Sequence, residues 1–155
     1  MSETKGNFKI DRISFKLGMI NCFAEMVACG VKKLALSPPL SPNDYETIRE
    51  YSDKIVEEFD INFFIEEDLL ITDLQSEDFT RGKCSILYFK DPEILDAYLA
   101  LKEKKREMEQ KGHYDEHARK KISRKFMHLL SYPEEKIKEK LSQKSPGSPF
   151  MLISD

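Results

Sequence analysis

The residue of this sequence best suited to acid or base chemistry is Glu25, a carboxyl within the apolar segment 15–29. On a helix, Gly18, Asn21 and Glu25 fall within about 60° of one another and form a narrow polar stripe. Burial would favour the protonated form of the Glu25 carboxyl, which could then serve as acid or base on a ligand bound by Asn21 in a gap beside Gly18. Alternatively, the stripe is the solvent edge of a packed helix, or Glu25 pairs with a structural Arg or Lys.

A second candidate is the loop 37–42, SPPLSP, which follows a short apolar segment. Ser37 and Ser41 could donate their hydroxyls to an anion at the start of the next helix. Pro42 removes one amide from such a site, and Asp44 would repel an anion from the same turn. The alternative is a loop that only caps its helix.

The polar connection 72–83, TDLQSEDFTRGK, brings together Asp73, Arg81 and Lys83. Arg81 and Lys83 on either side of Gly82 could hold a phosphate or a carboxylate, because Arg offers a bidentate fork and Gly lets the backbone approach closely. The connection is longer than a hairpin needs, which is typical of functional loops. Basic residues around a turn glycine are nevertheless common.

A basic stripe marks the segment 115–131, which we expect to be a helix. The stripe could bind RNA, DNA or an acidic protein surface, although it contains no aromatic side chain to stack on bases. His113 and His117 have the i,i+4 spacing of a metal pair, but the nearby carboxylates point elsewhere on a helix, so we expect no metal. The stripe lies within about 100° of one helix face and consists of His113, His117, Lys120, Lys121, Arg124 and His128.

Composition and missing motifs narrow the classes of function. The formal net charge of −3 argues against general affinity for nucleic acid or anionic membranes, so nucleic acid is the least favoured partner. No apolar run reaches the roughly 20 residues of a membrane span, and the first residues lack the core of a signal peptide, so we expect a cytoplasmic protein without a membrane partner. The motifs G-x-G-x-x-G, P-loop, H-E-x-x-H and G-x-S-x-G are absent, and we expect no cofactor.

The cysteines predict neither a disulfide nor a zinc framework. Cys22, Cys29 and Cys84 form an odd set without a C-x-x-C pair. Seven residues along a helix separate the first two by about 10 Å, which is too far for a bridge. We therefore expect three reduced thiols in the core.

The length of 155 residues predicts one α/β domain over residues 1–144, whose C-terminal half, 91–144, is helical, followed by a tail, 145–155. Cap signals predict most of the helices. The apolar run at the end of the tail could add an edge strand. The predicted helices are the segment 15–29 ended by Gly30, one opened by Ser41 and Pro42, one from Asp91 and Pro92 to Gly112, one capped by Asp115, and one from Pro133.

Short apolar runs predict a mixed sheet of about four strands, an α/β (mixed α+β) arrangement packed by helices. The first two strands enclose a helix, so we expect a βαβ crossover with parallel neighbours. The turn 66–68 should then form a hairpin with an antiparallel third strand. The predicted strands are 31–37, 61–65, 69–72 and 84–89.

Three functional hypotheses follow, and the sequence leaves open whether the chain is an enzyme. The first is a small cytoplasmic domain that binds a protein partner or an anionic small molecule, as a homodimer, because the first helix is apolar all round. The second is an enzyme acting on a phosphorylated or carboxylated metabolite, with Glu25 as acid or base and Arg81 or Lys83 holding the anion. The third is nucleic-acid binding through the helix 115–131.

Overall fold

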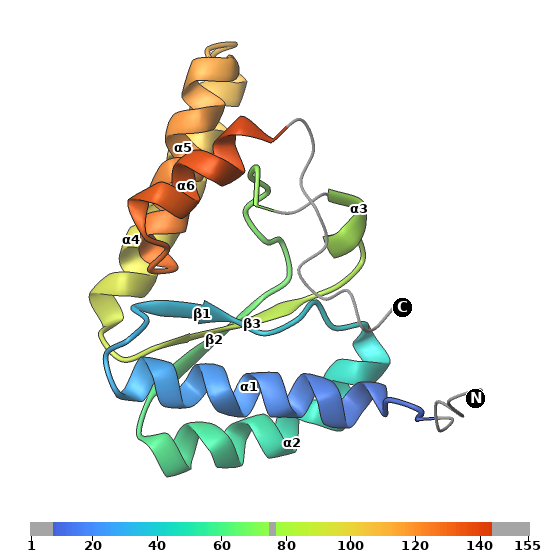
Figure 1. Cartoon of the computed structure of the whole chain (residues 1–155). Helices are drawn as coiled ribbons and strands as arrows, with labels where there is room; N and C mark the ends of the chain where they lie inside the picture. The colour runs from blue at the N-terminus through green and yellow to red at the C-terminus, as the bar shows by residue number, and fades with distance from the viewer. Residues whose placement is uncertain (1–7, 75–76, 144–155) are drawn as a thin grey trace, which may run out of the picture.

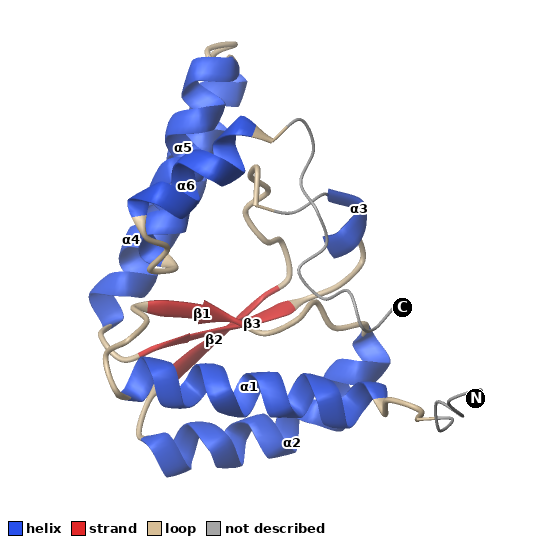
Figure 2. Ribbon diagram, viewed as in Figure 1, coloured by secondary structure: helices blue, strands red, loops and turns tan. Residues whose placement is uncertain are grey.

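A three-stranded antiparallel sheet lies between two groups of helices (Figures 1 and 2). This arrangement comes from a computed structural model, which describes residues 8–74 and 77–143. Mixed helix and strand content confirms the α+β class, but the sheet has three strands rather than about four. The strands are β1 (Leu34–Leu36), β2 (Asn62–Glu66) and β3 (Ser85–Phe89), in the spatial order β1-β3-β2.

The helices divide between the two faces of the sheet. α1 and α2 pack together beneath one face, whereas α4 and α5 rise from the other face with α6 against α5 (Figure 1). None of the described helices is long and apolar enough to cross a membrane. The helices are α1 (Arg12–Ala28), α2 (Pro42–Phe59), α3 (Glu77–Thr80), α4 (Pro92–Gln110), α5 (Glu116–Leu129) and α6 (Glu134–Ser142).

Alternation along the strands creates two cores. In β3, Leu87 points to the α4 and α5 side, and Tyr88 points to the α1 and α2 side. Leu34 and Ala35 divide between the same two cores in β1. Because β3 is the central strand and both faces of the sheet are covered, all five of its residues are buried.

The predicted strand 69–72 and its hairpin are wrong. Backbone groups of this segment bond to helix side chains instead of to a neighbouring strand: the Leu70 N–H donates to the Tyr98 hydroxyl at 3.1 Å, and the Ile71 carbonyl accepts from Lys105 Nζ at 3.1 Å. Leu69 and Leu70 are buried in the core beneath α4 and α5. These two backbone groups therefore have hydrogen-bond partners without a ladder.

The expected pairing of the first two strands is also wrong. β1 and β2 both pair antiparallel with β3, with Ala35 and Phe63 opposite Tyr88 on its two sides. The two strands that enclose α2 thus run in the same direction, but the third strand lies between them. Tyr88 also links this central strand to α2, because its hydroxyl lies 2.7 Å from the Ser52 hydroxyl within the core.

The cap signals predicted several helix starts correctly. The Ser41 hydroxyl accepts from the Asp44 N–H at 3.2 Å, and Asp115 accepts from the Ala118 N–H at 2.8 Å. The first helix begins three residues earlier than expected, because Asp11 caps it by accepting from the Ser14 N–H at 2.7 Å. Gly30 has a φ of 78°, as expected for a residue that ends a helix.

Two further expectations concern the cysteines and the tail. Cys22 and Cys29 are exposed on α1 rather than buried in the core, because the face that meets the sheet carries Ile20, Ala24 and Val27. Cys84 is partly buried beside the core under α1 and α2. The predicted edge strand in the tail, 145–155, lies outside the described residues.

Candidate functional site

The polar stripe of α1 faces solvent. Gly18, Asn21 and Glu25 are all exposed, and a Cβ added at Gly18 would meet nothing within 4 Å. The expectation that Glu25 is shielded from water is therefore wrong. The buried face of α1 lies opposite the stripe, so the stripe is the solvent edge of a packed helix. The exposed Glu25 side chain therefore lacks the shielding from water that the acid or base hypothesis requires.

The hydroxyls of the loop 37–42 serve the scaffold. Ser37 is buried, and its Oγ accepts from the Ile86 N–H at 2.8 Å and donates to the Pro38 carbonyl at 2.9 Å. Ser41 caps α2 through the Asp44 N–H. These contacts join the loop to β3 and to its own helix. They support the alternative interpretation, in which the loop caps its helix and binds no anion.

Asp73 and Arg81 of the 72–83 connection contact different elements. Asp73 pairs with Arg119 of α5, and its N–H donates to the Ser123 hydroxyl at 3.0 Å. Arg81 is exposed and pairs with Asp78 within the short helix α3, at 3.3 Å. Lys83 is partly buried. The described contacts therefore do not show one anion site built from these residues.

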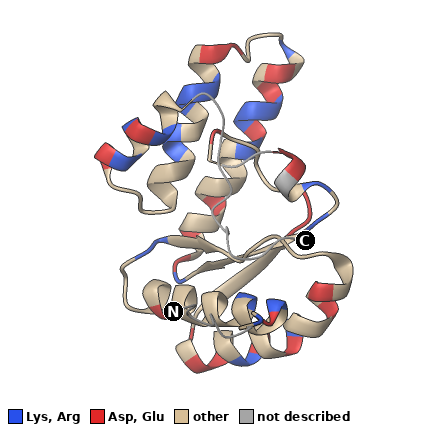
Figure 3. Cartoon of the chain, turned by 45° about the vertical axis from the view of Figure 1, so that its right-hand side comes forward, with Lys and Arg blue, Asp and Glu red and all other residues tan. Residues whose placement is uncertain are grey.

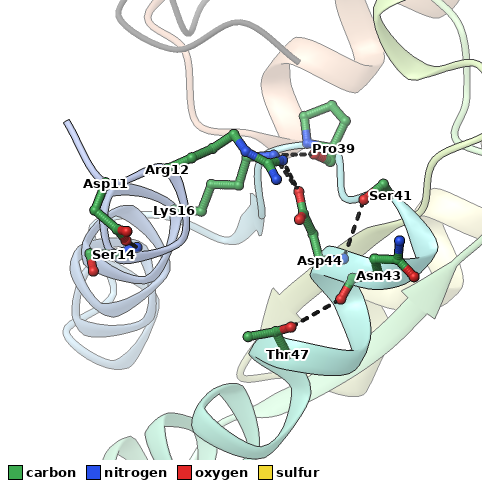
Figure 4. Close-up of polar contacts among 9 residues, drawn as sticks. All are labelled: Asp11, Arg12, Ser14, Lys16, Pro39, Ser41, Asn43, Asp44 and Thr47. Atoms are coloured by element: carbon green, nitrogen blue, oxygen red, sulfur yellow. Dashed lines mark hydrogen bonds and ion pairs between the residues drawn. The ribbon is translucent and has the colours of Figure 1, made fainter. Parts of the chain in front are cut away.

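A buried ion pair joins α1 to the first turn of α2 (Figure 4). Lys16 is 1% exposed, and its Nζ lies 3.1 Å from Asp44 Oδ2 and 3.3 Å from the Pro39 carbonyl. Arg12 pairs with the same carboxylate oxygen from the solvent side. Sequence reasoning missed Lys16, because in the sequence alone it has the appearance of an ordinary exposed polar residue. The hydrogen bonds and ion pairs of this cluster cross-link the two helices, which is a structural role.

A second buried polar cluster joins β2 to α4. Glu66 accepts from the Tyr98 hydroxyl and from Lys102 Nζ, both at 2.8 Å, and from the Asp68 N–H at 2.9 Å. Burial raises the pKa of the Tyr98 hydroxyl, and the hydrogen bond to Glu66 adds to the increase. Every polar group of the cluster is partnered, so it stabilises the loop after β2.

The groove beside this cluster has paired charges. It has a volume of about 570 Å³ and lies between Asp68–Ile71 and the outer face of α4. Its cations contact acceptors of the protein: Lys102 contacts Glu66, Lys105 contacts the Ile71 carbonyl, and Arg106 contacts Glu103. A ligand would have to compete with these contacts, so this groove is a poor binding site despite its size.

A smaller hollow between α4 and α5 is lined mainly by basic side chains, and we call it the α4–α5 pocket. It has a volume of about 260 Å³. α5 presents this side to solvent because Ile122, Phe126 and Met127 pack inward. The antiparallel turn at Gly112 brings Lys104 of α4 to the same hollow. Its polar lining consists of Lys104, His113, Asp115, His117, Lys121 and Lys125.

Positive charge is concentrated in the α4–α5 pocket. In the described part of the chain, Lys104, Lys121 and Lys125 have no Asp or Glu oxygen within 4.0 Å. The Lys104 ammonium lowers the pKa of Lys125, with smaller contributions from desolvation and from Lys121. Asp115 also lines the pocket, but its Oδ1 accepts from the Ala118 N–H. The like charges repel each other, and an anion would relieve this repulsion.

A second basic hollow continues from the first across α5, and we call it the α5–α6 pocket. It has a volume of about 460 Å³. His117 and Lys121 line both pockets, so the two are contiguous. Lys120 of the second pocket pairs with Glu116 at 3.4 Å, and Arg124 pairs with Glu134. The lining consists of His117, Lys120, Lys121, Arg124, Lys138, Leu141 and Ser142.

Basic and acidic residues are concentrated on opposite sides of the sheet. α5 carries five Lys or Arg residues and one Glu, whereas α2, on the opposite side, carries six acidic residues and two basic ones. Figure 3 shows the charged turns of these helices above and below the sheet. A protein of net negative charge thus presents a basic surface on one side, which can attract and orient an anionic partner.

Sequence reasoning found half of the basic surface. It identified the α5 stripe, including His117, Lys121 and Arg124, but missed Lys125 of the same helix, and Lys104 and Lys138, which come from the neighbouring helices. The signal for Lys104 is present in the sequence, because a short turn at Gly112 joins the lysine-rich second half of α4 to α5 and makes the two helices antiparallel neighbours. Lys104 follows from this arrangement once the lysines that face each other across the two helices are identified.

The described residues contain no group of three or more His, Cys, Asp or Glu side chains placed to hold a metal ion. Comparison with protein-family models, with curated proteins and with solved structures finds no match for this chain. The case for function therefore depends on the geometry and charge of the site.

Proposed function

We propose that this chain is a binding domain for a phosphate-bearing anion, which it holds in the α4–α5 pocket. The main support is that Lys104, Lys121 and Lys125 meet at a concave surface without an acidic partner in the described part of the chain. A phosphate group carries up to two negative charges and several acceptor oxygens, so it could accept hydrogen bonds from all three ammonium groups.

The lining of the pocket favours binding over catalysis. Asp115 is the one carboxylate among its described lining residues, and that carboxylate caps α5. A nucleophile beside a general base, or a pair of carboxylates, is not found among these lining residues. The enzyme hypothesis also required a shielded Glu25, and that side chain is exposed.

Titration with inorganic pyrophosphate at low ionic strength tests the proposal. We expect saturable binding by isothermal titration calorimetry, and we expect Lys104→Gln and Lys125→Gln each to weaken it by up to about fivefold, since an exposed ionic contact contributes up to about 1 kcal/mol. Lys90→Gln is the matched control, because the substitution removes the same charge at an exposed position. Lys90 lies just before the start of α4, away from the pocket at the other end of that helix.

The pH dependence provides an independent check. A bound anion favours the protonated form of Lys125, whose pKa is lowered mainly by Lys104. Affinity for pyrophosphate should therefore be greatest below that pKa and fall as the pH rises through it. Lys125→Gln should remove this part of the pH dependence. Equal losses in the pocket variants and in Lys90→Gln would contradict the site.

We also propose that the chain forms a homodimer through the outer face of α1. Apolar and thiol side chains recur there at intervals of four and three residues, the spacing of a helix seam that packs against another helix. Met26 is 39% exposed, and Cys22 and Cys29 are exposed as well. The seam consists of Phe15, Met19, Cys22, Met26 and Cys29.

Sedimentation of the pure protein tests the dimer. We expect a dimer at high micromolar concentration and a monomer for Met26→Lys, because a charge in the middle of the seam cannot be buried without a partner. Tyr51→Lys is the control, since Tyr51 is an exposed large side chain on α2, outside the seam. A monomeric wild-type protein at this concentration would refute the dimer.

A further inference from the structure

The two basic pockets form one continuous surface across α5, which we call the basic track. Lys104 of α4 lines the α4–α5 pocket, Lys138 of α6 lines the α5–α6 pocket, and the two pockets share His117 and Lys121. We propose that the basic track binds the phosphodiester backbone of a nucleic acid. This inference rests on the proposed function, because it makes the anion of the α4–α5 pocket one phosphate of a longer chain.

The stretch of α5 that lines the two pockets is long enough to contact several successive phosphates. From His117 to Lys125 an α-helix spans about 12 Å. Along a DNA duplex, each strand carries one phosphate about every 3.4 Å of helix axis. The axial length of this stretch of α5, which lines the two pockets, therefore matches about three phosphate steps. A single small anion would leave the α5–α6 pocket unused, including Lys138, which has no acidic partner within 4.0 Å in the described part of the chain.

The lining chemistry indicates contact with phosphates rather than with bases. The described lining residues of both pockets are basic, hydroxyl-bearing, aliphatic or thioether side chains, plus Asp115, and none of them has a phenyl, phenol or indole ring. Single-strand binding proteins hold bases on aromatic platforms, and the described lining residues include no Phe, Tyr or Trp for this purpose. Lys and Arg contacts to phosphate carry no sequence information. We therefore expect binding that is independent of base sequence and favours a duplex.

The acidic side of the molecule would restrict binding to one orientation. α2 lies across the sheet from the track and carries five exposed carboxylates, so it repels a polyanion. This reconciles a formal charge of −3 with local affinity for nucleic acid, because short-range contacts at the track are screened less than the distant repulsion.

Fluorescence polarisation with labelled oligonucleotides tests the inference, alongside the pyrophosphate titration. The probes are DNA and RNA duplexes of about 16 base pairs and the corresponding single strands, a length within the reach of small binding modules. We expect a duplex to bind, with an affinity that is the same for unrelated sequences and falls steeply with salt. The DNA and RNA arms identify which source of the backbone is preferred.

Two matched variants separate the track from the single pocket. Lys104→Gln and Lys138→Gln should each weaken oligonucleotide binding by about fivefold and reduce the slope against salt by about 1. For pyrophosphate, Lys104→Gln should weaken binding and Lys138→Gln should leave it unchanged. Both lysines are exposed, so the variants should fold normally.

The outcomes distinguish the two proposals. If pyrophosphate binds but oligonucleotides do not, or if Lys138→Gln leaves oligonucleotide binding unchanged, the nucleic-acid track is refuted and the pocket survives. If poly-glutamate binds as tightly as the duplex, the surface recognises acidic protein, and the inference is again refuted. If oligonucleotides bind but Lys104→Gln affects neither ligand, the α4–α5 pocket is refuted as the anion site.

Discussion

Replacing Asp44 with alanine is expected to lower the free energy of unfolding by about 3 kcal/mol, because it removes the carboxylate that faces a buried ammonium group. The Lys16 and Asp44 side chains are 1% and 5% exposed, and their charged atoms lie 3.1 Å apart. The Pro39 carbonyl still accepts from Lys16 in the variant. For that reason we expect the lower end of the range measured for broken buried pairs.

Urea denaturation measures this effect, and two further variants interpret it. Asp53→Ala is the matched control, since it removes an exposed carboxylate from the same helix and should change stability by less than about 0.5 kcal/mol. The double variant Lys16→Met, Asp44→Leu should recover much of the loss, because it removes both charges from the core. A loss for Asp44→Ala no larger than that for Asp53→Ala would show that the buried pair does not stabilise the fold.

Alkaline pH is expected to destabilise the protein through Tyr98 and Tyr88. Burial raises the pKa of both hydroxyls above the ordinary 10.0. Above that value the unfolded chain loses a proton at each tyrosine while the folded chain retains it. The unfolded state then binds fewer protons, so stability falls as the pH rises, by about 1.4 kcal/mol per pH unit for each tyrosine.

Tyr98→Phe isolates the contribution of one hydroxyl. In this variant the decline above about pH 10 should be shallower than in the wild type by about 1.4 kcal/mol per pH unit, as measured by denaturant unfolding at several pH values. At neutral pH the variant should lose about 1–3 kcal/mol, because the Leu70 N–H and the Glu66 carboxylate each lose a partner. Tyr51→Phe, at an exposed site, should leave the slope unchanged. A slope for Tyr98→Phe equal to that of the wild type would contradict the role of this hydroxyl.

The candidate site illustrates the limits of reasoning along a helix. The periodicity of α5 placed His117, Lys121 and Arg124 on one face, because the residues that pack inward recur with the helical period. The same reasoning applied to α1 selected Glu25 as buried, since most of its neighbours are apolar. It failed there because apolar composition does not say which face of a helix meets the sheet.

Buried charge also could not be found by local reasoning. Lys16 and Asp44 are 28 residues apart, and Glu66 and Tyr98 are 32 apart. In the sequence alone, Lys16, Asp44 and Glu66 have the appearance of exposed polar positions, since charged residues are rarely buried without a partner. Only the packing of α1 on α2, and of α4 on the sheet, supplies the partners that make burial possible.

The sequence by itself determined the α+β class, the starts of α2 and α5 through Ser41 and Asp115, and the basic face of α5. These features depend on hydrogen bonds and spacing within a few residues, so neighbouring side chains suffice to specify them. The tertiary structure decided the strand order, the non-strand conformation of residues 69–72 and the meeting of Lys104 with Lys125. Those depend on which distant segments compete for the same backbone groups and the same buried surface, and that competition is settled only when the whole chain packs.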